Sequence, residues 1–154
     1  MKAYAYFFIA ASLVSGATDP FVGTWTLNAH KSRYPPGTCP KRMVIRMESA
    51  GEGVHYRSET TFANGVSASS EYTADYAGAE SIVTGSKGLM PPVSLRRLDT
   101  RTVQASYVRA LKPVATSRRV VSKDGRIMTI TTTSKDKDSI VVTTVGVYEK
   151  ASTK

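Results

Sequence analysis

The sequence predicts an all-β protein, an antiparallel up-and-down β-barrel of about eight to ten strands. Threonine, valine, serine and tyrosine are abundant after residue 17, and these residue types suit a pleated, half-buried surface. Turn-forming residues recur about every eight to twelve positions, which is typical of sandwiches and barrels. No segment of this region shows the periodicity of an amphipathic helix.

The first 17 residues are typical of a secretory signal peptide. Lys2 precedes an apolar run over residues 3–14, which is too short to span a bilayer, and residues 15–17 are the small residues that a signal peptidase recognises. We place cleavage after Ala17, with an uncleaved membrane anchor as the alternative. Residues 18–154 then form one secreted or periplasmic domain, without a transmembrane segment, that is long enough for a single core.

We predict strands in this domain at 23–28, 41–48, 53–62, 67–76, 80–84, 93–98, 101–109, 114–122, 126–134 and 139–149. Two links are expected to be tight hairpins, because Asn64-Gly65 and Asp124-Gly125 tolerate the positive φ of primed turns. Short links between consecutive strands indicate a meander, and closing the meander removes its exposed edges.

The late strands do not alternate cleanly between apolar and polar residues. One face of residues 127–133 carries Ile127 with three threonines, and the other carries Met128, Ile130 and Thr132. A one-sided sheet would place apolar residues inside and polar residues outside. The mixed faces fit a barrel with a polar, ligand-binding interior, and they fit equally well small residues spaced for close packing.

The formal charge of +9 falls to +8 without Lys2, and the basic residues are scattered in isolated pairs. No nucleic-acid-binding motif accompanies them, so we expect no nucleic-acid partner. The charge predicts either an ordinary basic surface or attraction to an anionic envelope surface. Cys39 is the only cysteine and cannot form an internal disulfide, so packing and hydrogen bonds must hold the fold.

Three segments resemble fatty-acid-binding proteins and, more broadly, calycin-type barrels. "DPFVGTWTLN" resembles the first strand, "RRVVSKDGRIMTITTT" the penultimate hairpin and "IVVTTVGVYEKA" the closing strand. A closer resemblance is to exported bacterial proteins of uncharacterised function with a lipocalin-like fold, through "GTWTLNAHKS", "YPPGTCP", "RRVVSKDGRIMTITT" and "VYEK". This second similarity covers most of residues 18–154. It implies a fold and export but no reaction.

Two departures from the fatty-acid-binding pattern are visible. The helix–turn–helix lid of that family is replaced by "AHKSRYPPGTCP", whose prolines and glycine argue against a helix, so a cavity would be open there or plugged by the loop. The family's carboxylate-binding arginine, two residues before the closing tyrosine, is replaced by Gly146. This replacement argues against fatty-acid carriage in particular.

Two arginines are candidates for contact with an anionic ligand. Arg97 alternates with Val93 and Leu95, and Arg118 shares a face with Val120, while Arg119 lies on the other face with Val121. An inward arginine binds carboxylate or phosphate, whereas an outward one is simply solvated. An arginine buried without an acidic partner would be a strong indication of a ligand, because burying an unpaired charge is costly.

Three further residues complete the candidate ligand site. Trp25 either lines the cavity or seals one end of the barrel. Met128 and Tyr148 suit a cavity wall, and they also suit ordinary core packing.

No catalytic residue, metal ligand or cofactor is indicated. His30 and His55 have no second ligand at a recognised spacing, and no nucleophile elbow is present. We therefore expect a binding protein for a small hydrophobic or amphipathic ligand, with an anionic group as one option. The alternatives are a solid barrel whose basic exterior contacts envelope membranes or polysaccharide, and a small hydrolase or isomerase.

Overall fold

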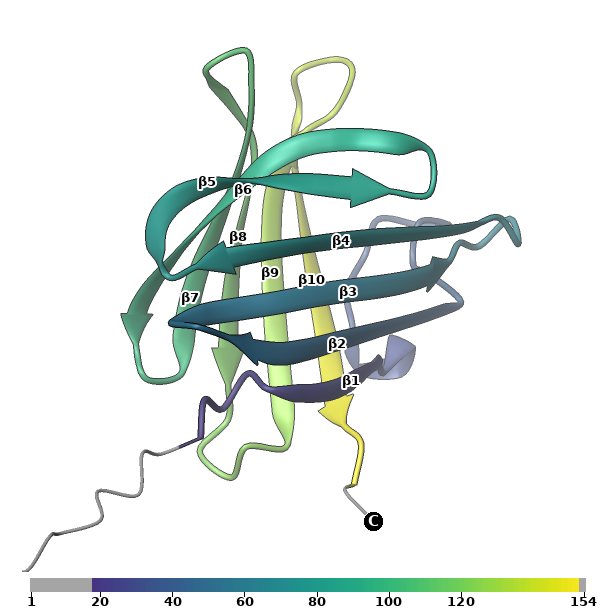
Figure 1. Cartoon of the computed structure of the whole chain (residues 1–154). Coiled ribbons are helices and arrows are strands. Elements are labelled where there is room, and N and C mark those ends of the chain that lie inside the picture. The colour runs from purple at the N-terminus through teal and green to yellow at the C-terminus, as the bar shows by residue number, and fades with distance from the viewer. Residues whose placement is uncertain (1–17, 153–154) are drawn as a thin grey trace, which may run out of the picture.

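Ten antiparallel strands form one closed barrel in the computed structural model, which confirms the predicted fold class (Figure 1). The structure describes residues 18–152, so the predicted signal peptide lies outside the described residues. The strands are β1 Gly23–Leu27, β2 Arg42–Ala50, β3 Gly53–Thr61, β4 Ser67–Asp75, β5 Ala77–Gly85, β6 Gly88–Asp99, β7 Thr102–Arg109, β8 Lys112–Val121, β9 Ile127–Lys135 and β10 Val141–Lys150. Each pairs with the next, and β1 closes the barrel against β10.

Helix is almost absent from the part of the chain that the structure describes. The loop between β1 and β2 contains one turn of 3₁₀ helix, η1 (Ala29–Lys31), in place of a helical lid. Nowhere in residues 18–152 is a helix long and apolar enough to cross a bilayer.

The up-and-down connectivity sorts the links between strands to two ends of the barrel. We call the end that carries the β2–β3, β4–β5, β6–β7 and β8–β9 hairpins the closed end. The other end, which we call the open end, carries the loop of residues 28–41 and the β3–β4, β5–β6, β7–β8 and β9–β10 hairpins.

The two predicted hairpins form, but not with primed turns. Gly65 N donates to Phe62 O and Gly125 N donates to Ser122 O, each at 2.9 Å. Only the glycine of each pair has positive φ, 86° at Gly65 and 75° at Gly125. Asn64 stays outside the left-handed region because its side chain instead accepts a hydrogen bond from the backbone two residues ahead.

β5 and β6 are longer than the sequence predicted, by several residues each. The predicted sixth strand begins only after the prolines, because proline lacks the N–H that a ladder needs. In the structure, Pro91 and Pro92 together oppose the single residue Ile82, so the strand continues through a bulge.

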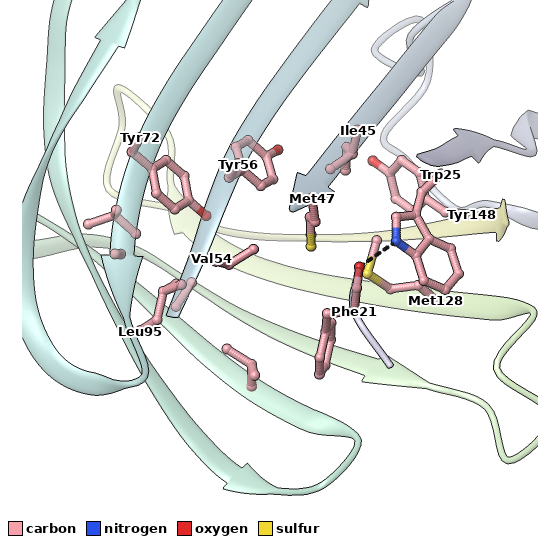
Figure 2. Packing of buried hydrophobic residues seen from close by; sticks show 14 of the residues in the cluster. Phe21, Trp25, Ile45, Met47, Val54, Tyr56, Tyr72, Leu95, Met128 and Tyr148 are labelled. Atoms are coloured by element: carbon pink, nitrogen blue, oxygen red, sulfur yellow. Dashed lines mark hydrogen bonds between the residues drawn. The ribbon is translucent and has the colours of Figure 1, made fainter. Parts of the chain in front are cut away.

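Apolar side chains fill the closed end around Trp25, which is fully buried (Figure 2). The indole Nε1 donates to the carbonyl of Phe21 at 2.9 Å, so the polar edge of the ring is satisfied where no water reaches it. Met47 and Met128 are buried in the same cluster. Removing a ring of this size from water contributes about 4 to 6 kcal/mol of hydrophobic free energy.

Candidate functional site

A cavity of about 330 Å³ lies within the open half of the barrel. Its inner wall comes from the inward positions of β2, β3 and β4, and its rim from the β5–β6 hairpin. The lining includes Met43, Tyr56, Ser58, Phe62 and Met90. A volume of this size is at the lower end of the range for small-molecule sites, and the mixed apolar and hydroxyl lining suits an amphipathic occupant.

Arg119 on β8 lies inside the barrel and is 3% exposed. Its Nη2 donates to the Tyr107 hydroxyl at 3.2 Å, and its Cζ lies 5.2 Å from the centre of the Tyr56 ring. Nε has no hydrogen-bond partner, and no carboxylate within residues 18–152 approaches the guanidinium to 4.0 Å. The structure therefore holds a buried positive charge without a counter-ion, which is costly in a low dielectric.

Tyrosines surround this guanidinium and do not neutralise it. The Tyr56 and Tyr72 rings stack with centres 4.6 Å apart, and the buried Tyr72 hydroxyl lies against the guanidinium without an aligned hydrogen bond. Burial raises the pKa of Tyr56 to about 12 and raises the pKa of Tyr72 further. Both phenols are therefore neutral at physiological pH, and Arg119 keeps its full charge.

Tyr56 and the neighbouring Ser58 link the cavity to the guanidinium. The Tyr56 ring belongs to the cavity wall and also contacts Arg119. The hydroxyls of Ser58 and Ser70 lie 2.8 Å apart on the wall, and Ser117, next to Arg119 on the same face of β8, bonds with Thr132 at 2.8 Å. The cavity thus has an apolar rim and a hydroxyl-rich floor that leads to a positive charge.

Gly146 on β10 leaves room for two tyrosines at the open end. A Cβ there would lie 3.0 Å from the Tyr34 hydroxyl and 2.8 Å from a Tyr148 ring carbon. Tyr34 comes from the loop of residues 28–41, which a bridge between Arg33 and Val145 holds to β10. The loop therefore partly plugs the barrel, one of the two outcomes that the sequence allowed.

Three of the five candidate residues lie in the closed half. Trp25 and Met128 are fully buried in the apolar cluster and are not part of the cavity lining. Arg97 donates to Asp19 Oδ2 at 2.9 Å and to the Thr100 carbonyl at 2.9 Å, and it lies over Tyr76. The guanidinium of Arg97 is thus already paired with an acid.

The other two candidates differ in position. Tyr148 is buried, and its hydroxyl donates to Sδ of Met43, a cavity residue, at 3.2 Å. Arg118 is exposed on the outer face of β8, and its neighbour Arg119 points inward instead. The structure therefore brings Tyr148 near the cavity and leaves Arg118 in solvent.

Neither Arg119 nor Tyr56 is among the five residues that the sequence singled out. Arg119 shares its face of the strand with Ser117 and Val121. This pattern predicts an inward position only weakly, because the opposite face, with Arg118 and Val120, contains a valine as well. Only the closed barrel shows which of the two faces is inside.

A polar cluster lies outside the barrel on β3 and β4. Nε2 of the His55 ring lies 2.6 Å from the carboxylate of Glu71, which also pairs with Arg57 at 3.1 Å. These bonds lower the pKa of Glu71, with His55 the larger cause. Across residues 18–152, no group of three or more His, Cys, Asp or Glu side chains is placed to hold a metal ion.

Comparison with solved structures defines the class of fold. The zebrafish ileal bile acid-binding protein, solved in complex with cholic acid, superposes with a TM-score of 0.58 at 14% identity, covering 86% of this chain and 99% of that chain. The chain is thus a closed ten-stranded barrel of the calycin, fatty-acid-binding-protein-like fold. No sequence family and no curated protein matches it.

Proposed function

We propose that this protein is an exported carrier of a small amphipathic molecule with an anionic head. The apolar body of the ligand would occupy the cavity beside Met43, Phe62 and Met90. Its head would reach past Tyr56 and Ser58 to pair with Arg119. Export rests on the composition of residues 1–17 alone.

The observation that carries this proposal is the unpaired guanidinium of Arg119. Buried arginines are normally paired with acids, because water no longer solvates the charge. Here the Tyr72 hydroxyl lies against the Arg119 guanidinium, Nε of Arg119 and this hydroxyl are buried without an aligned hydrogen bond, and no acid pairs with the charge. A carboxylate or similar anion beside these groups would supply the missing counter-charge and accept a hydrogen bond from the guanidinium. The cavity also favours this carrier over a solid barrel whose exterior alone is functional.

Arg119 supplies inside the barrel the positive charge that is missing at Gly146, so a fatty acid is a suitable probe despite that replacement. Calorimetric titration with dodecanoate and with dodecanol, which share a chain length but differ in charge, tests the proposal. Arg119→Gln is expected to weaken dodecanoate binding about 10- to 100-fold, the effect of one charge-assisted hydrogen-bonded contact. Dodecanol binding should change little, because the cavity wall is intact. Arg118→Gln removes an equal charge from the outer face and serves as the matched control.

Equal losses for dodecanoate in Arg119→Gln and Arg118→Gln would contradict the proposal, since the effect would then be one of overall charge. The proposal would also be contradicted if the unmodified protein bound neither dodecanoate nor dodecanol. Circular dichroism of each variant checks that the barrel remains folded.

A further inference from the structure

Exposed apolar side chains gather at the open end of the barrel. Leu111 in the β7–β8 hairpin is 95% exposed, Leu89 beside the β5–β6 turn 80%, and Ile140 beside the β9–β10 turn 61%. We call these three residues the apolar tips. β8 pairs with β9, and Leu89 and Leu111 border one shallow depression, so the three hairpins are neighbours. Figure 1 shows the β7–β8 and β9–β10 turns projecting together beyond the barrel.

The backbone at the β7–β8 tip is strained as well as exposed. Ala110 and Leu111 both have positive φ, 48° and 63°. A two-residue turn of this kind normally contains asparagine or aspartate followed by glycine, because other side chains are strained in the left-handed region. The chain therefore holds a fully exposed leucine in a strained conformation at the point where the hairpin extends farthest.

Basic residues flank the apolar tips. The three hairpins, residues 85–90, 108–114 and 134–141, contain Lys87, Arg109, Lys112, Lys135 and Lys137. None of the five makes a salt bridge within residues 18–152. The two acids in these hairpins, Asp136 and Asp138, lie in one turn, where the Asp136 carboxylate accepts from two backbone N–H groups. The apolar tips thus lie among free cations.

The closed end has neither property. Its four hairpins, residues 50–53, 75–78, 98–102 and 121–127, contain three basic and four acidic residues. Leu98, at 45%, is the one large hydrophobic side chain of these hairpins that is strongly exposed in the described structure. The contrast between the two ends means that the cationic, apolar character belongs to one end and is not a general property of the surface.

We propose that the open end docks on the surface of an anionic lipid bilayer. The three tips share one end of the barrel, and Leu89 and Leu111 border one depression, so Leu89, Leu111 and Ile140 would enter the interface together while the flanking lysines and arginines contact lipid phosphates. Apolar insertion combined with several cations is what reversible binding to anionic membranes requires. Docking in this orientation turns the cavity mouth, which Leu89 and Met90 line, toward the lipid. The inference goes beyond the carrier function and does not depend on it, because docking is measured without ligand.

The test is co-sedimentation with vesicles of phosphatidylcholine alone and of phosphatidylcholine with an equal part of phosphatidylglycerol. The protein is expected to bind the mixed vesicles, and the binding should weaken as salt is added. The triple variant L89S/L111S/I140S should bind them at least about tenfold more weakly, since it loses the inserted side chains. The control variant I82S/L98S/V120S removes three exposed apolar residues from elsewhere on the barrel and should bind as the unmodified protein does.

A charge series separates the two contributions. K112Q/K135Q/K137Q should weaken binding to the mixed vesicles, whereas R101Q/K123Q/R126Q, at the closed end, should not. Circular dichroism shows whether each variant is folded.

Several results would overturn the proposal. These are absence of binding to mixed vesicles, equal binding to both kinds of vesicle, and equal losses in the two triple serine variants. Self-association that sedimentation velocity detects, and that L89S/L111S/I140S abolishes while vesicle binding stays absent, would assign the tips to a second copy of the chain instead.

Discussion

A single buried charge dominates the interior of this barrel at the scale of the residue. Arg119 has one hydrogen bond to Tyr107 and one contact with the Tyr56 ring to offset the loss of water around its guanidinium. A hydrogen bond from a charged donor and a cation–π contact together contribute about 2 to 5 kcal/mol. Desolvation of an unpaired ion costs several kcal/mol even after relaxation. Arg119 is therefore expected to destabilise the empty barrel.

Arg119→Met tests this balance. The substitution keeps most of the side-chain volume and removes the charge, so it is expected to raise the free energy of unfolding by about 1 to 3 kcal/mol. Urea unfolding followed by the fluorescence of Trp25 measures the change. Arg118→Met, on the outer face, should stay within about 0.5 kcal/mol of the unmodified protein. Destabilisation by Arg119→Met would mean that the contacts of the guanidinium outweigh its desolvation.

The sequence shows that an arginine could lie inside but not which one. Strand periodicity assigns Arg118 and Arg119 to opposite faces, and each face contains a valine next to its arginine. The deciding information is the pairing of β8 with β7 and β9, which sets Arg119 opposite Val103 and Ile130. Arg97 is a similar case, because its partner Asp19 is 78 positions away in sequence and becomes its neighbour only when the barrel closes.

The strand is the scale at which the sequence was most informative. Eight of the ten predicted strands agree with the structure to within two residues at each end, because threonine, valine and tyrosine runs between turn residues mark them plainly. The exceptions, β5 and β6, contain Gly78 and the Pro91-Pro92 pair, which a local propensity argument treats as strand breakers. The β-bulge that accommodates the prolines depends on the partner strand, so local sequence does not predict it.

Hairpin turns also differ in how well their residues suit their geometry. The β7–β8 turn places Ala110 and Leu111 at positive φ, where Asn-Gly is preferred. The double substitution Ala110→Asn/Leu111→Gly is therefore expected to raise the free energy of unfolding by about 1 to 2 kcal/mol, which thermal unfolding measures. This gain should come with weaker binding to anionic vesicles, because the same substitution removes an apolar tip.

A control substitution at the β3–β4 hairpin is expected to change the free energy of unfolding in the opposite direction. Gly65 has a φ of 86°, and a Cβ added to it would have no other atom within 4 Å, so Gly65→Ala adds strain without a steric clash. It should lower the free energy of unfolding by about 1 kcal/mol. If both changes move stability in the same direction, turn strain is not the cause.

At the scale of the whole molecule, up-and-down connectivity gives the two ends of the barrel different surfaces. Basic residues that are scattered in the sequence gather at the open end. The basic residues at positions 87, 109, 112, 135 and 137 lie in separate segments of the sequence, which is why the sequence predicts a scattered charge. Alternate hairpins of a meander project from the same end, so three of them gather these cations. The grouping of these cations can be inferred from the order of the strands alone. Locating the cavity and the buried arginine also needs the positions of the side chains.

Buried tyrosines make the stability of the whole barrel depend on alkaline pH. Burial raises the pKa of Tyr56 from 10.0 to about 12, and it raises the pKa values of Tyr72, Tyr76 and Tyr148 as well. In the unfolded chain these phenols ionise near pH 10, so above that pH the folded state binds more protons than the unfolded state. Their contribution is complete below pH 10 and is lost as the pH rises toward the folded pKa values.

The expected outcome is a steep fall in the free energy of unfolding above pH 10. At about pH 11, Tyr56 alone accounts for a loss of about 1 kcal/mol relative to neutral pH. Tyr56→Phe removes the ionisable group, so its loss over the same pH interval should be smaller by about that amount. Urea unfolding at neutral pH and at about pH 11 measures both losses. Equal losses in the two proteins would show that Tyr56 ionises freely in the folded barrel, which its position between Arg119 and Tyr72 argues against.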